Sequence, residues 1–144
     1  MIIPDSCHEV FVPVSAGIIV SLLNRFILNN PNYPKDGVPY WDFNAPNIPN
    51  EERDASAGAI TASALLELSK YSGAKGKRYY NDAVTMMESL SSPAYRAALG
   101  ENNNFLIKHC VGAKGLNSEI DVPLIYADYY YLEALLRLQN YKQK

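Results

Sequence analysis

Four segments of this chain carry apolar side chains at intervals of three and four residues, the period of a helix. They cover residues 15–29, 55–71, 77–90 and 123–140, and Pro93 can start a short helical turn over residues 93–99. No segment alternates apolar and polar residues as a half-buried strand does, although residues 105–107 are compatible with a short extended piece. The pattern therefore predicts an all-α fold.

The second and fourth of these helices lack a polar face. Residues 55–64 are mostly Ala, Gly and Ser, so neighbouring helices can approach closely, and residues 123–140 carry few charges. Asp54 and Asp121 are the predicted N-caps. We expect these two helices to be inner helices and the helices over residues 15–29 and 77–90 to be amphipathic outer ones.

A long loop precedes each predicted inner helix. Residues 32–53 contain four prolines with several aromatic residues, and residues 100–121 form the second loop. If the inner helices are parallel, both loops open at the same end, where unpaired helix N–H groups favour an anionic ligand. Antiparallel helical hairpins with long loops at one end predict a partial α/α toroid.

Composition limits the classes of protein to which this chain can belong. The chain of 144 residues is 48% hydrophobic and 19% charged with a net charge of -2, which fits one globular domain over residues 1–144 and gives no case for nucleic-acid or anionic-membrane binding. Residues 1–20 fit the scheme least well and lack the basic region of a signal peptide, so the compartment, bacterial cytoplasm or periplasm, stays open. Cys7 and Cys110 suit no zinc spacing and favour free thiols.

Several segments resemble one family. Residues 38–46 (VPYWDFNAP), 53–60 (RDASAGAI) and 64–68 (ALLEL) resemble the second half of unsaturated glucuronyl hydrolases, which are glycoside hydrolase family 88. Residues 117–138 resemble that family's closing helix. The resemblance runs from about residue 24 to the C-terminus, and the combination of the two blocks is specific.

The resemblance implies a six-hairpin toroid that removes unsaturated uronic acids from oligosaccharides released by polysaccharide lyases. In that family an Asp protonates the C4–C5 double bond, water adds at C5 and the hemiketal opens, without a metal or an organic cofactor. The general acid/base Asp lies in the half that this sequence does not match, so no catalytic residue is predicted. We expect a C-terminal part of such an enzyme, from a truncated or split gene or a deliberately cut chain, that is inactive alone.

The candidate substrate-binding residues lie in the two loops and at the start of the last helix. Each has a structural alternative. Tyr40 and Trp41 can stack on a sugar or pack within the loop, and Asp42 can bond a sugar hydroxyl or form a local turn. Arg53 can bind the uronate or form an ion pair with Glu51 or Asp54. The Lys in the second loop can contact a carboxylate or a sulfate, and at most one Tyr of the last helix reaches the pocket. The six residues are Tyr40, Trp41, Asp42, Arg53, Lys114 and Tyr126.

Three other residues invite a functional interpretation. Asp128 falls in a buried helix and can serve as an acid, but a core Asp bonded to a Tyr hydroxyl is the favoured interpretation. His109 and Cys110 are adjacent and cannot easily face each other, so a semi-buried structural pair is favoured over a dyad.

Two other functions compete with the hydrolase prediction. One is a non-catalytic helical-repeat module that binds carbohydrate or acts as a scaffold, and a weaker one is a regulatory helical domain without a ligand. An incomplete toroid leaves inner-helix faces uncovered and is expected to form a homodimer or aggregate, whereas a self-sufficient module is expected to be a monomer.

Overall fold

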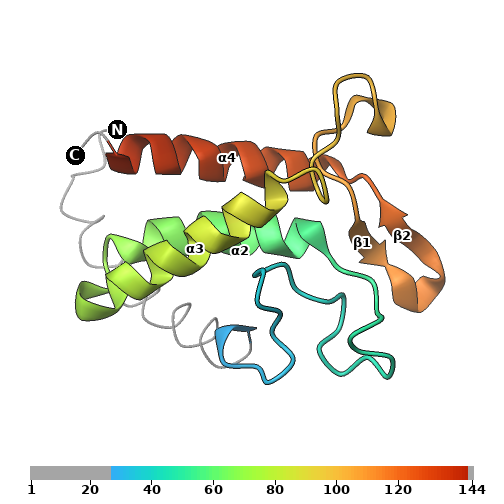
Figure 1. Ribbon diagram of the computed structural model, residues 1–144, viewed down its shortest axis with the longest axis horizontal. Coiled ribbons are helices and arrows are strands. Elements are labelled where there is room, and N and C mark those ends of the chain that lie inside the picture. Colours follow the sequence, from blue (N-terminus) through green and yellow to red (C-terminus); the bar gives the residue numbers. More distant parts are fainter. Residues whose placement is uncertain (1–26, 143–144) are drawn as a thin grey trace, which may run out of the picture.

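The computed structural model describes residues 27–142, so most of the predicted helix over residues 15–29, and Cys7 with it, lies outside the described part. Three helices form the body: α2 (Ala55–Ser69), α3 (Gly76–Leu90) and α4 (Ile125–Lys142). A small sheet contains β1 (Cys110–Ala113) and β2 (Ser118–Val122) (Figure 1). None of the helices in this range is both long and apolar enough to cross a bilayer.

Helix α2 is the central helix, as its small side chains predict. Asp54 is its N-cap, accepting a hydrogen bond from the Ser56 amide at 3.0 Å. Buried positions occur on several faces of the helix, which packs against both α3 and α4, whereas α3 and α4 touch little. The predicted inner position of α2 is therefore confirmed, and α3 is amphipathic as predicted.

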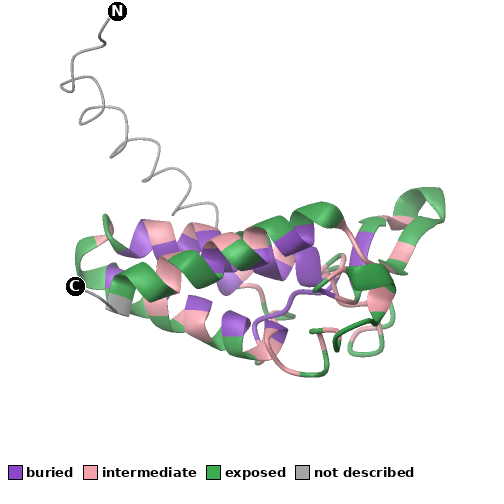
Figure 2. Cartoon of the chain, turned by 90° about the horizontal axis from the view of Figure 1, so that it is seen from above, coloured by how far each residue is buried: buried purple, intermediate pink, exposed green. Residues whose placement is uncertain are grey.

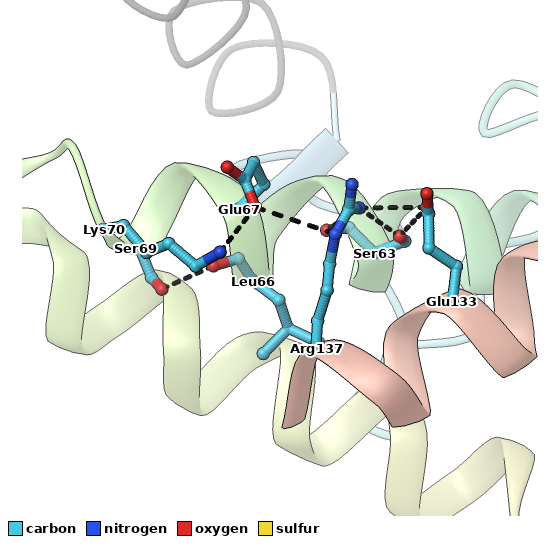
Figure 3. Close-up of polar contacts among 7 residues, drawn as sticks. All are labelled: Ser63, Leu66, Glu67, Ser69, Lys70, Glu133 and Arg137. Carbon is cyan, nitrogen blue, oxygen red and sulfur yellow. Dashed lines mark hydrogen bonds and ion pairs between the residues drawn. The ribbon is translucent and has the colours of Figure 1, made fainter. Parts of the chain in front are cut away.

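Helices α2 and α4 run in the same direction. Arg137 of α4 donates to the carbonyl of Ser63 at 2.8 Å and lies 3.7 Å from the carboxylate of Glu67, while Glu133, one turn earlier in α4, bonds the Ser63 hydroxyl (Figure 3). The partner in α4 thus moves forward as the chain moves forward along α2. Helix α3 runs the opposite way, and both long loops open at the end where α2 and α4 begin (Figure 1).

The second long loop contains a hairpin that the sequence pattern did not predict. Strands β1 and β2 pair antiparallel, with Val111 opposite Ile120 and an irregularity between Cys110 and Val111. Asn117, at the end of the connecting turn, is left-handed with φ of 53°. Asp121 is not the N-cap of α4, because it lies within β2. Residues 92–96 make a hydrogen-bonded turn, Arg96 then pairs with Ile107, and a second turn begins at Ala98.

Helix α4 is buried on one side only. Ala127, Tyr131 and Ala134 face the core, whereas large apolar side chains on its other side remain exposed. Figure 2 shows buried (purple) and exposed (green) positions interspersed along the helices. The expectation of a largely buried helix is therefore wrong for this side within residues 27–142. The sequence nevertheless indicated correctly that α4 has no polar face.

The loop before α2 is ordered and packs closely. Gly37 has φ of 76°, and a Cβ there would lie 2.7 Å from Cγ of Met86, so the position requires glycine. Val38, next in sequence, is fully buried against the core. This packing carries the rest of the loop to the start of α2.

Candidate functional site

The start of α2 joins the two loops. The Ala55 amide donates to the carbonyl of His109 at 2.9 Å, and the Val111 amide donates to the Asp54 carboxylate at 3.3 Å. The Asp54 amide also donates to the Pro39 carbonyl at 2.8 Å. Asp54 therefore holds the hairpin through its carboxylate and the first loop through its amide, both at this helix end.

Trp41 and Lys114, two of the predicted site residues, both bind Glu51, and Lys114 also contacts Glu52. The Trp41 indole donates to Oε2 of Glu51 at 2.9 Å, and Lys114 Nζ lies 2.9 Å from the same oxygen and 5.0 Å from the centre of the Trp41 ring. Lys114 also pairs with Glu52. The hydrogen bond from Lys114, followed by that from Trp41, lowers the pKa of Glu51 to about 2. The Lys114 charge therefore has two carboxylate partners, and it fastens the hairpin to the loop.

Arg53 and Tyr40 form a second pair. Arg53 donates from Nε to the Val38 carbonyl at 2.8 Å and from Nη2 to Asp36, and its guanidinium lies 4.8 Å from the centre of the Tyr40 ring. Tyr40 is buried and also pairs with Arg53 through the backbone. The ion-pair partner of Arg53 is therefore Asp36 and not Glu51 or Asp54. These contacts use Nε and Nη2 of the guanidinium.

An open pocket of about 300 Å³ lies beside Arg53. The Nδ1 atom of His109 lies 2.5 Å from the carboxylate of Asp121, and the ring of Tyr95 meets that of His109 edge-on at 6.1 Å. His109 and Asp121 both have positive φ, of 61° and 54°. Sequence reasoning missed this pair, because the two residues are brought together by the β1–β2 hairpin, which the sequence pattern did not predict. The pocket is lined by Glu52, Arg53, Ala94, Tyr95, His109 and Asp121.

The remaining two predicted residues lie apart from these clusters. Asp42 is exposed and accepts a hydrogen bond from the Asn44 amide at 2.8 Å, which is the local-turn alternative. Tyr126, in the first turn of α4, is 39% exposed. Burial and the nearby carboxylates of Asp54 and Glu119 raise its pKa. As part of the first turn of α4, Tyr126 lies at the end of the fold where both long loops open.

Two buried groups that invite a catalytic interpretation have structural partners. Asp128 accepts hydrogen bonds from the amides of Leu106 and Ile107, both at 2.9 Å, so it holds the loop before β1 by backbone bonds and not through a Tyr hydroxyl. Cys110 is a free, fully buried thiol, and burial raises its pKa to about 12. Among residues 27–142 no three acidic, His or Cys side chains gather in a way that suits a metal ion.

Comparison with known proteins places these features in a family, although no family model matches the chain. An unsaturated glucuronyl hydrolase of Formosa agariphila is 47% identical over 116 residues, which are 81% of this chain and 28% of that protein. An unsaturated glucuronyl hydrolase of Bacillus sp. strain GL1 is 40% identical over 110 residues, or 74% of this chain and 29% of that protein.

Solved structures agree with these relatives. The crystal structure of an unsaturated glucuronyl hydrolase specific for heparin matches with a TM-score of 0.81 and 48% identity, covering 86% of this chain and 33% of that chain. A variant of the Streptococcus agalactiae enzyme complexed with dGlcA-GalNAc6S matches with a TM-score of 0.72 and 27% identity, covering 88% and 36%. The helical hairpins are thus part of an α/α toroid. The chain therefore belongs to the unsaturated glucuronyl hydrolase family, as a partial member that spans about 30% of the length of the relatives it matches.

Proposed function

We propose that this chain is part of a glycoside hydrolase that acts on oligosaccharides ending in an unsaturated uronic acid, and that it supplies one wall of the sugar-binding site. The supporting observation is that Trp41, Arg53, Lys114 and Tyr126 lie at the end of the fold where α2 and α4 begin. The S. agalactiae relative, complexed with dGlcA-GalNAc6S, gives the substrate class.

Recognition of the uronate rests on Arg53 in this proposal. Asp36 and the Val38 carbonyl fix the guanidinium, and Nη1 remains for a carboxylate beside the start of α2, whose dipole favours a negative charge. Trp41 and Tyr95 supply aromatic surface for sugar rings. Asp42 and Tyr40, by contrast, have local structural partners and contribute indirectly.

The proton donor for hydration of the C4–C5 double bond comes, in this proposal, from outside residues 27–142. A general acid must hold its proton near neutral pH. The pKa of Glu51 is shifted the opposite way, to about 2. Asp54 and Asp128 accept backbone hydrogen bonds, while Asp36 and Asp121 pair with Arg53 and His109. We therefore propose that the chain alone binds the sugar and does not turn it over.

Calorimetric titration of the 144-residue chain with an unsaturated uronic disaccharide tests the proposal, with the saturated disaccharide as reference ligand. We expect preferential binding of the unsaturated sugar, and weaker binding for Arg53→Lys and Tyr126→Phe. Tyr129→Phe, which alters a more exposed tyrosine of the same helix, is the matched control. Equal binding of the two sugars would favour a non-catalytic carbohydrate-binding module, and loss of the double-bond absorbance would contradict inactivity.

A further inference from the structure

We propose that Asp36 is a positioning residue of the sugar-binding site: its carboxylate contacts both Arg53 and Tyr95 and sets the orientation of one relative to the other. Arg53 and Tyr95 line the same pocket of about 300 Å³, and Asp36 lies behind them. The inference rests on the proposed function, in which Arg53 binds the uronate and Tyr95 offers its ring to the sugar. Asp36 acts on the ligand only through these two side chains.

The carboxylate of Asp36 has a fixed place in the fold. Its Oδ1 atom accepts a hydrogen bond from the Val38 amide at 3.2 Å, within a turn in which the Gly37 amide donates to the Pro34 carbonyl at 3.0 Å. The backbone at Gly37 packs directly against α3, since a Cβ there would lie 2.7 Å from Cγ of Met86. Val38 is fully buried. The turn that carries Asp36 is therefore anchored in the core.

This turn makes two contacts with Arg53. The Nε atom of Arg53 donates to the Val38 carbonyl at 2.8 Å, and its Nη2 atom donates to Oδ1 of Asp36. Two bonds from one planar guanidinium fix the direction of its plane, which a single bond does not. The centre of the Tyr40 ring lies 4.8 Å from the guanidinium carbon. Asp36 therefore supplies the second of the two bonds that orient Arg53.

The other carboxylate oxygen of Asp36 contacts Tyr95. The Tyr95 hydroxyl donates to Oδ2 at 3.4 Å, a long hydrogen bond between residues 59 positions apart. Burial raises the pKa of Tyr95, so the hydroxyl keeps its proton and acts as the donor. The Tyr95 carbonyl accepts a hydrogen bond from the Lys108 amide at 2.8 Å, which holds the backbone of this residue. The two oxygens of one carboxylate thus connect the cationic and the aromatic side of the pocket.

A second role for Asp36, simple neutralisation of the Arg53 charge, makes the opposite prediction. The side chains of Asp36 and Arg53 are 40% and 23% exposed, and ion pairs this accessible add little to the free energy of unfolding. The effect of Asp36 is therefore expected in ligand binding. Removal of a mere counter-charge strengthens binding of an anionic sugar, whereas removal of a positioning residue weakens it. The sign of the change separates the two roles.

Calorimetric titration with an unsaturated uronic disaccharide and with its methyl ester, which lacks the negative charge, tests the proposal. For Asp36→Ala we expect at least about tenfold weaker binding of the acid and a smaller loss for the ester. Asp36→Asn keeps an acceptor oxygen and should restore part of the affinity for the acid. The matched control is Glu88→Ala, which removes an exposed carboxylate from α3.

Tyr95→Phe removes the contact with Asp36 and keeps the ring. It should weaken binding of the acid and of the ester by the same factor. The double variant Asp36→Ala, Tyr95→Phe should bind the ester no more weakly than Asp36→Ala alone, because both changes remove one and the same contact. Additive losses for the ester would show that Asp36 does not orient Tyr95.

Nuclear magnetic resonance of the Arg53 Nε–H group tests the orientation without a sugar. Its exchange with water should be slow in the unmodified chain and at least about tenfold faster in Asp36→Ala, with circular dichroism and urea unfolding as checks that both are folded. Unchanged exchange would overturn the proposal. Tighter binding of the acid by Asp36→Ala, or an equal loss for acid and ester, would also overturn it. If the unmodified chain binds neither sugar, the proposed function fails and the exchange rate alone decides the role of Asp36.

Discussion

Lys114 Nζ lies 2.9 Å from Oε2 of Glu51, although 63 residues separate them in the chain. The contact joins the β1–β2 hairpin to the loop before α2, and the Trp41 indole shares the same carboxylate oxygen. The only tryptophan of the chain therefore reports on this junction.

Acidification is expected to open the junction only at low pH. The pKa of Glu51 falls from an ordinary 4.5 to about 2, so the ionised form is favoured in the folded chain. The stabilisation is present in full above pH 4.5 and is lost as the pH falls toward 2. Trp41 fluorescence should hold steady down to pH 4.5 and change below it.

Glu51→Gln is the control for this titration. It should show, at neutral pH, the Trp41 emission that the unmodified chain shows only in acid, with helical circular dichroism unchanged. A change of Trp41 emission that is complete above pH 4.5 while the helices stay intact would contradict the role of Glu51.

Removal of the Asp128 carboxylate is expected to destabilise the fold. Asp128→Ala leaves the amides of Leu106 and Ile107 without their acceptor, at a cost of roughly 2 to 4 kcal/mol in the free energy of unfolding. Asp128→Asn, which keeps one acceptor oxygen, should lose less. Urea denaturation measures both, with Glu88→Ala, at an exposed position of α3, as the control. Equal stability of Asp128→Ala and the control would show that the carboxylate does not hold the loop.

Cys110 is expected to resist alkylation in the folded chain. The thiol is fully buried, and burial raises its pKa to about 12, so the reactive thiolate is scarce at neutral pH. Peptide mapping after iodoacetamide treatment should find Cys110 modified in denaturant and unmodified under native conditions. Native labelling at the rate of the denatured chain would contradict the burial of this strand.

The sequence predicted well those helices whose position depends only on the periodicity of their own side chains. The small residues of α2 and the apolar face of α3 are local signals, and both helices lie close to their predicted bounds. The sequence pattern did not predict the β1–β2 hairpin because its strands are only four and five residues long. In addition, Glu119 and Asp121, within β2, have positive φ. Positive φ is uncommon for residues other than glycine, and the modest enrichment of Asp there does not single out Asp121.

The site was predictable only in part, because its contacts join distant residues. Arg53 was identified as a candidate, but its partner Asp36 lies 17 residues earlier, and the pairing of His109 with Asp121 depends on the unpredicted hairpin. The apolar character of α4 was predicted, yet one side of this helix, with Ile125, Tyr129, Leu132 and Leu136, stays exposed within residues 27–142.

The most direct test is the ultraviolet absorbance of the C4–C5 double bond in an unsaturated uronic disaccharide. The absorbance is followed with the 144-residue chain alone, with the part of the Formosa agariphila relative that this chain does not match, and with the two together. We predict steady absorbance with either part and loss of absorbance with the mixture. Loss of absorbance with the chain alone, or steady absorbance with a mixture that light scattering shows to be assembled, would contradict the account.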